Sequence, residues 1–195
     1  ARQVHPRLAT GPKTVALIHR IDGLIAEMGV AEEIVRWRIR LATLTRNMEH
    51  DELFMWLEKL RLRHADRSIV RDSVVLAPRV AAQLGDQDLS AWSTYKLLSR
   101  LTTESLVYLI AVTDNRSAHE RVYEYLSELR HRRSQLSGAD IIALGLRQGP
   151  QIGMVLQSLL RERVEGRVTS KEEEMRMARD LVAACRAADG RQASL

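Results

Sequence analysis

The residues most suited to chemistry lie between positions 136 and 171, where glycine, proline and arginine occur in a pattern that favours phosphate binding. Gly149 and Pro150 separate two helical patterns, and proline suits the first position of a helix because the N–H there needs no partner. The amide groups that open the second helix would then point outwards with the positive end of the helix dipole. Three amides occupy this first turn, those of Gln151, Ile152 and Gly153. The spacing predicts a backbone cradle for an anion; the alternative is a helix–turn–helix whose glycines only allow close packing.

The residues before this turn predict a short helix that ends at a glycine. Ser137 is suited to cap the N-terminus of a helix over residues 139–144, and Asp140 falls in its first turn. Gly145 stands where a left-handed residue commonly ends a helix. We therefore expect a short helix, a tight turn and a longer helix in this order.

Positive charge is concentrated in the same part of the chain. Residues 130–167 contain seven arginines and three acids, which account for most of the net charge of +5. A solvated charged surface is the commoner meaning of the cluster at 130–133. Of the two tyrosines before it, we expect Tyr123 to face outwards.

Two runs in this region resemble a known family. They are LSGADIIALGLRQGPQIGMVL, at residues 136–156, and EGRVTSKEEE, at residues 165–174. Together they resemble the tail of the bacterial class II tRNA nucleotidyltransferases. These are the CCA-adding enzymes of tRNA processing and the related bacterial poly(A) polymerases. The resemblance covers about forty residues, and Arg147-Gln148 departs from the apolar or proline residues common at that place in the family.

The resemblance implies that this region binds tRNA or another folded RNA by its backbone. The family's tail grips the tRNA elbow, so the resemblance assigns Gly149, Gln151, Ile152 and Gly153 as amide donors. It assigns the charge to Arg147, Arg161 and Lys171, with Arg132 and Arg133 as auxiliary residues.

The catalytic motifs of that family are not found in this sequence. Its head domain carries a Gly-Ser turn followed by Asp-x-Asp on a strand, and its neck carries Glu-Asp-x-x-Arg; the sequence has neither arrangement. We therefore expect body and tail without the head, no cofactor or metal in this chain, and no activity from it alone. The resemblance implies that the parent enzyme uses Mg²⁺ and ATP or CTP, and that the head belongs to the same polypeptide.

Two other functions are compatible with the sequence. A helical protein-interaction or regulatory domain without an RNA partner would use the arginine-rich faces against an acidic surface or leave them solvated. A metal-dependent phosphohydrolase is suggested only by His50-Asp51, and no related motif surrounds His19, Asp66 or Asp72. Asp51 is better explained as a first-turn acid of a helix.

The composition is that of a helical globular protein. Of 195 residues, 45% are hydrophobic, which is enough for a substantial core. Twenty-six of the thirty basic residues are arginine; arginine suits phosphate, although a GC-rich genome gives the same bias. The single Cys185 cannot form an internal disulfide, which favours a reducing cytoplasm. No apolar run has the length of a membrane span.

The apolar spacing predicts an all-α fold, an irregular bundle of about ten helices like the body and tail of the class II enzymes. We expect helices at 14–28, 31–48, 51–62, 67–84 with a break near Pro78, 90–101, 103–112, 116–130, 139–144, from 150, and 172–187. The stripe Ile34, Trp37, Leu41 and Leu44 should face the core, as should Trp56 and Trp92. The expected organisation is a linker or frayed lead at 1–12, a helical body at 13–133, a helical tail with the glycine-rich turn at 134–188 and a disordered end at 189–195.

Overall fold

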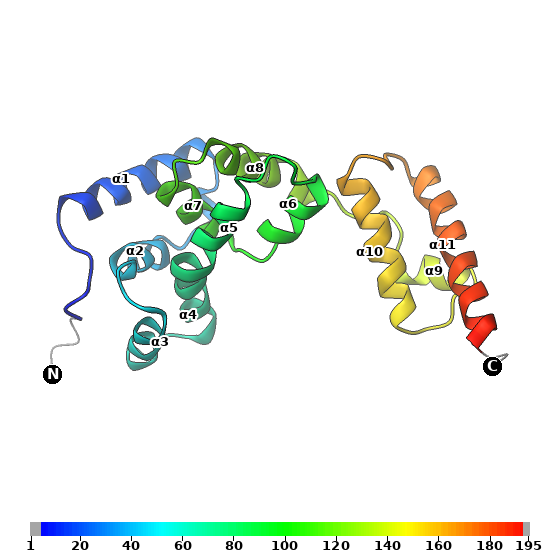
Figure 1. The fold of residues 1–195 in the computed structure, drawn as a ribbon, viewed down its shortest axis with the longest axis horizontal. Helices are drawn as coiled ribbons and strands as arrows, with labels where there is room; N and C mark the ends of the chain where they lie inside the picture. Colours follow the sequence, from blue (N-terminus) through cyan, green and yellow to red (C-terminus); the bar gives the residue numbers. More distant parts are fainter. Residues whose placement is uncertain (1–4, 193–195) are drawn as a thin grey trace. The chain divides into compact units, whose positions relative to one another are not determined.

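The structure is a computed structural model that describes residues 5–192, and side chains as far as residue 187. Within this part of the chain every regular element is helical, which confirms the predicted all-α class (Figure 1). The α-helices are α1 (Pro12–Glu27), α2 (Arg36–Thr45), α3 (His50–Lys59), α4 (His64–Arg71), α5 (Ala77–Gln83), α6 (Ala91–Leu98), α7 (Thr103–Val112), α8 (Arg116–Ser127), α9 (Gly138–Ala143), α10 (Pro150–Val164) and α11 (Lys171–Gln192). None of the described helices has both the length and the apolar character needed to cross a membrane.

The described chain divides into two compact units. The first comprises residues 5–89 and 96–126, and the second comprises residues 90–95 and 127–192. The predicted boundary between body and tail, at 133/134, lies seven residues after the boundary at Leu126 and Ser127. The end of the chain also differs, because α11 continues to Gln192, where disorder was expected from residue 189. The rest of that predicted segment, residues 193–195, lies outside the described residues, as do residues 1–4 of the predicted lead.

Helix α7 is the centre of the first unit. All its residues from Glu104 to Ala111 are buried, and α1, α2, α4 and α5 pack against it. Thr102 caps the helix, because its hydroxyl accepts a hydrogen bond from the amide of Ser105 at 3.3 Å. The predicted helix at 103–112, apolar on most sides, is therefore confirmed.

The predicted break near Pro78 is also confirmed. Between α4 and α5 the chain forms one π-helical stretch, Asp72–Leu76, and Pro78 stands in the first turn of α5. A proline inside a helix leaves a carbonyl one turn earlier without a donor. In the wider π turn the carbonyls just before the proline pair with amides five residues later, as Asp72 does with Ala77. The chain therefore continues directly into α5.

The predicted helix at 31–48 is wrong in its first five residues. The chain forms only a 3₁₀ turn, η1 (Ala31–Glu33), and is extended at Ile34 and Val35 before α2 begins. The interruption changes which side of α2 faces the core. Trp37 is 43% exposed, whereas Ile39 and Ala42 are buried. Of the expected inner stripe, Ile34 is buried, while Leu41 and Leu44 are only half-buried.

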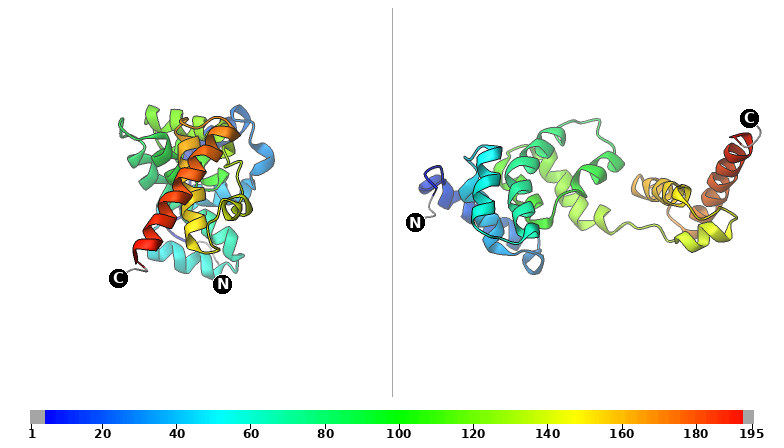
Figure 2. Two further views of the ribbon diagram at one scale, coloured as in Figure 1. Left: turned by 90° about the vertical axis from the view of Figure 1, so that its right-hand side faces the viewer. Right: turned by 90° about the horizontal axis from the view of Figure 1, so that it is seen from below.

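In the second unit, α9, α10 and α11 enclose one apolar core, and α10 packs against both α9 and α11 (Figures 1 and 2). The buried core residues are Leu136, Ile141, Leu146, Val155, Leu159, Ala178 and Val182. Trp92 is also buried, as predicted, and its amide donates to Oε1 of Glu165 at 3.1 Å. This hydrogen bond ties residues 90–95 to the end of α10.

Candidate nucleic-acid interface

The turn before α10 forms as predicted. The hydroxyl of Ser137 accepts a hydrogen bond from the amide of Asp140 at 3.4 Å, and Oδ2 of Asp140 accepts one from the amide of Ser137 at 2.7 Å. The hydrogen bonds from the Ser137 hydroxyl and backbone, and then the charge of Lys171, hold the pKa of Asp140 below its ordinary value. Gly145 follows α9 with φ 97°, as expected for a residue that ends a helix in the left-handed region.

The glycines at the start of α10 are not required by packing. Gly149 has φ 166°, which any residue adopts, and a Cβ atom added at Gly149 or Gly153 would meet no atom within 4 Å. Both residues and Pro150 between them are exposed. The alternative interpretation, that these glycines only allow close packing, is therefore wrong at this corner.

Two earlier glycines differ in this respect. A Cβ at Gly138 would lie 3.5 Å from Cγ2 of Ile152, and a Cβ at Gly145 would lie 3.2 Å from Nη1 of Arg186. A side chain at Gly138 would therefore make an ordinary contact within the second unit, whereas Gly145 is favoured by its φ of 97°. The open corner at residues 149–153 is accessible to an outside group.

One of the predicted amide donors is already engaged. The amide of Ile152 donates to the carbonyl of Gly149 at 3.2 Å, because the first turn of a helix can tighten through a bond between residues three apart. The Ile152 side chain packs against the core. Gln151 is half-buried and has interactions within the protein. The backbone at Gly149 and Gly153 is the most open part of the predicted cradle.

Arg147, Arg161 and Lys171 are exposed, as a role in binding requires. Arg161 belongs to an exposed face of α10, because the helical repeat places it above four other exposed residues, namely Pro150, Gly153, Met154 and Gln157. In the described part of the chain, neither Arg147 nor Arg161 has a carboxylate within ion-pair distance. Their charge is available to an external anion.

Arg132 has a structural position instead. Its Nη1 donates to the carbonyls of Arg163 and Val164 at 3.2 and 2.9 Å, and its Nη2 donates to Glu128 at 3.4 Å. The guanidinium therefore satisfies the carbonyl groups that end α10. Arg133 is exposed, and its Nη1 donates to the carbonyl of Arg132 at 3.2 Å.

Not all seven arginines of residues 130–167 have a charge that is available for binding. Arg163 lies 3.3 Å from Glu174, and Arg167 pairs with Glu162 and, at 3.8 Å, with Glu165. The hydrogen bonds with Arg167 hold the pKa of Glu162 below its ordinary value. Two of the seven arginines are thus neutralised within the fold, in addition to the engaged Arg132.

The sequence did not indicate Arg186. This exposed residue of α11 brings its guanidinium next to Gly145, at the turn that carries Arg147. It follows Val182, which is buried, by one helical turn. Only its spacing from the apolar stripe of α11 could have suggested that it reaches the turn between α9 and α10.

The remaining candidates lie in the first unit. His50 and Asp51 are exposed at the start of α3, and the described residues contain no group of three potential metal ligands. Tyr123 is half-buried, and its hydroxyl donates a hydrogen bond to Oε1 of Glu27 at 2.8 Å. The ring is therefore held within the first unit and is not free to stack on a base.

Comparison with known proteins relates this fold to one family, although no family model matches the sequence. The chain is 23% identical over 185 residues to an A-adding tRNA nucleotidyltransferase of Geobacter sulfurreducens. This alignment covers 91% of this chain and 21% of that protein. It is also 41% identical over 78 residues to a CC-adding tRNA nucleotidyltransferase of Thermus thermophilus. That alignment covers 35% of this chain and 18% of that protein.

A solved structure described as the complex of a CCA-adding enzyme with ATP has the same fold, with a TM-score of 0.63 and 17% identity. It covers 87% of this chain and 40% of that chain. The present chain thus spans about a fifth of the length of the curated relatives that it matches. These likenesses and the all-helical architecture show that the chain is related to the tRNA nucleotidyltransferase family.

Proposed function

We propose that this chain is the RNA-binding C-terminal region of a tRNA nucleotidyltransferase or poly(A) polymerase-like enzyme. It holds folded RNA, tRNA in the first place, while a catalytic head elsewhere in the polypeptide adds nucleotides to the 3′ end. The single observation that supports this role is the open corner at residues 149–153, where two exposed glycines face open space rather than neighbouring atoms.

Gly153 makes α10 less stable than another residue would at this position. Glycine inside a helix is less favourable than alanine by roughly 0.5–1 kcal/mol, and no neighbouring atom offsets this cost here. A backbone without a side chain is useful where another chain must approach it closely. A sugar-phosphate strand fits this position, because the start of α10 attracts anions and Arg147 is exposed beside it.

The proposed recognition depends on shape and phosphate contacts rather than on base edges. Arginine donates to phosphate oxygens from a planar group with several N–H donors, and Arg161 extends the basic surface about 16 Å along α10 from Pro150. Lys171 and Arg186 are the further cations of the second unit that we assign to this surface. Contacts of this kind position a folded RNA without selecting its sequence.

The chemistry of nucleotide addition is assigned to the head domain. We propose that Mg²⁺ and ATP or CTP bind there, since nucleotidyl transfer requires carboxylates that hold metal ions between the attacking and leaving oxygens. The role of the two helical units is to place the RNA so that its 3′ end reaches that site.

A filter-binding titration with tRNA at 50 and 200 mM salt tests the proposal. Neutralisation of three phosphates predicts that affinity falls about 40-fold between these concentrations. Absence of tRNA binding at 50 mM salt would contradict the proposal and favour a protein-interaction domain.

A further inference from the structure

The hairpin formed by α3 and α4, residues 50–71, carries a second concentration of positive charge. Residues 59–71 contain five basic side chains and a single acid, Asp66. That acid is buried, and its Oδ1 accepts a hydrogen bond from Nε of Arg38 at 2.7 Å. It therefore does not neutralise the exposed end of the hairpin, where Lys59, Arg61 and Arg63 are all exposed.

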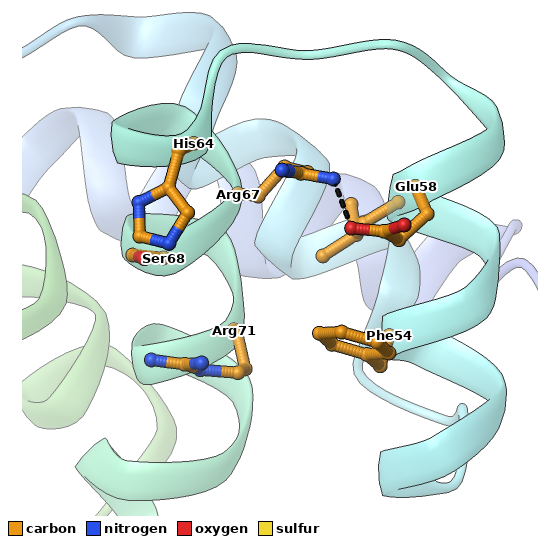
Figure 3. Close-up of a pocket in the computed structure, with 7 residues that line it drawn as sticks. Phe54, Glu58, His64, Arg67, Ser68 and Arg71 are labelled. Atoms are coloured by element: carbon orange, nitrogen blue, oxygen red, sulfur yellow. Dashed lines mark hydrogen bonds and ion pairs between the residues drawn. The ribbon is translucent and has the colours of Figure 1, made fainter.

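A pocket lies between the two helices of this hairpin (Figure 3). Helix α3 contributes Phe54 and Glu58, one turn apart, and α4 contributes residues from three successive turns of one face. These are His64, Arg67, Ser68 and Arg71. Arg67 pairs with Glu58 across the pocket, as the dashed line in Figure 3 shows.

The pocket combines an aromatic surface with donors for an anion. Phe54 is 51% exposed, so its ring can be covered by another planar group. Arg71 is held by Asp72, whose Oδ1 accepts from Nε and Nη2 at 3.1 and 3.0 Å. Nη1 of Arg71 has no partner among the described residues. An aromatic ring beside guanidinium groups is the arrangement on which unpaired nucleotides stack.

The backbone at Arg61 gives independent support. Arg61 has φ 53°, and among the described residues it is the one non-glycine residue with positive φ. It follows the end of α3, and its amide donates to the carbonyl of Glu58 at 3.0 Å. Glycine is the usual residue at such a position, because a Cβ atom is strained there. Non-glycine residues held in this region cluster at ligand-binding and other functional sites.

We propose that the α3–α4 hairpin binds an unpaired nucleotide of an RNA strand, with the base stacked on Phe54 and the adjoining phosphate held by Arg71. Arg61 and Arg63, at the other end of the hairpin, hold phosphates further along the strand. This inference rests on the proposed function only in that RNA is the ligand; it concerns a separate surface in the first unit. An acidic protein segment is the alternative ligand, and failure of the single-stranded RNA described below to bind would favour it.

Arg61→Gly separates binding from folding. Removal of the strain should raise the midpoint of thermal unfolding by about 2–4 °C. Affinity for a dye-labelled single-stranded RNA of about eight nucleotides, measured by anisotropy, should nevertheless fall, and the slope of log affinity against log salt should decrease by about 0.7, the value for one lost phosphate contact. Arg79→Gln is the matched control, because Arg79 is exposed outside the hairpin.

Phe54→Ala tests the stacking contact. It should lower the affinity about fivefold or more and leave the salt slope unchanged, because no charge is removed. Met55→Ala is its control, since Met55 is 57% exposed on the same helix and does not line the pocket. Free AMP should compete only weakly; binding of AMP as tight as that of the oligonucleotide would overturn the assignment to an RNA strand.

The outcomes distinguish this inference from the proposed function. If Arg61→Gly and Phe54→Ala bind the oligonucleotide like their controls while tRNA still binds to the wild-type chain, the hairpin site is refuted and the proposed function stands. If the wild-type chain binds the oligonucleotide but not tRNA, the proposed function fails alone. If it binds neither RNA, both are refuted.

Discussion

The carboxylate of Glu174 is fully buried in the second unit, and its Oε2 accepts a hydrogen bond from Nη1 of Arg163 at 3.3 Å. The same carboxylate accepts from the hydroxyl of Ser134 at 2.5 Å and from the amide of Gln135 at 3.0 Å. One charge therefore connects α11, the end of α10 and the segment that leads into α9. This network fixes the chain on both sides of the open corner.

Glu174→Ala should destabilise the second unit by about 3–5 kcal/mol, because it leaves Arg163 and the Gln135 amide without their partner. Glu174→Gln should cost less, since its amide oxygen still accepts. The measurement is urea unfolding followed through Trp92, with Trp37 and Trp56 replaced by Phe so that only the second unit reports. Glu172→Ala, at an exposed position of the same helix, should be neutral; equal effects at residues 172 and 174 would contradict the network.

The two types of glycine in the second unit should respond oppositely to alanine. Gly145→Ala introduces a Cβ at φ 97° and 3.2 Å from Arg186, and it should cost about 1–2 kcal/mol. Gly153→Ala adds a side chain in open space inside a helix, and it should stabilise by about 0.5–1 kcal/mol. Thermal unfolding of both variants measures the difference. A loss of stability in Gly153→Ala would show that the corner is packed after all.

Arg38 should be essential to the first unit, in contrast to its neighbour Arg36. Although partial burial opposes its charge, hydrogen bonds to Glu104 and Asp66 raise the pKa of Arg38 above its ordinary value. Arg38→Met leaves two buried carboxylates unpaired and should cost about 3–5 kcal/mol. Arg36→Met removes only an exposed pair with Asp22 and should cost less than about 1 kcal/mol. Chemical denaturation of both variants compares them directly.

The first unit should lose stability at alkaline pH. Burial raises the pKa of Tyr108 from its ordinary value of 10 to about 12, and partial burial and the Glu27 carboxylate raise the pKa of Tyr123 to about 12. A raised pKa means that the folded state favours the neutral phenol. The contribution of these tyrosines to the free energy of unfolding is complete below pH 10. It is lost between pH 10 and 12, because the tyrosines of the unfolded chain ionise first. Unfolding midpoints across this range should fall, and Tyr108→Phe should flatten the decline; an unchanged profile would contradict this assignment.

The elements that the sequence predicted best are those with local signals. Ser137, Gly145 and Pro150 act on their own neighbours through capping, left-handed backbone and a missing N–H, so the turn before α10 was predictable. The continuous apolar character of residues 103–112 likewise predicted burial. The tail resemblance depended on the same local residues.

The features that could not be predicted depend on residues far apart in the sequence. The amide of Val35 lies 3.5 Å from Oε1 of Glu104, and this contact between distant residues accompanies the break that shortens α2. Arg132 ends α10 through carbonyls more than thirty positions away, and Arg186 reaches the turn at Gly145 only because α11 packs beside it. Single-sequence spacing cannot indicate such partners.

Binding of tRNA to Gly153→Glu, compared with Gly23→Glu, tests the central claim most directly. Gly23 is also an exposed helical glycine with open space around it, but it lies in α1 of the first unit. Both variants should keep wild-type helicity by circular dichroism. The account predicts that Gly153→Glu binds tRNA at 50 mM salt far more weakly than the wild type does, while Gly23→Glu binds like the wild type. Equal affinity of the two variants for tRNA would contradict it.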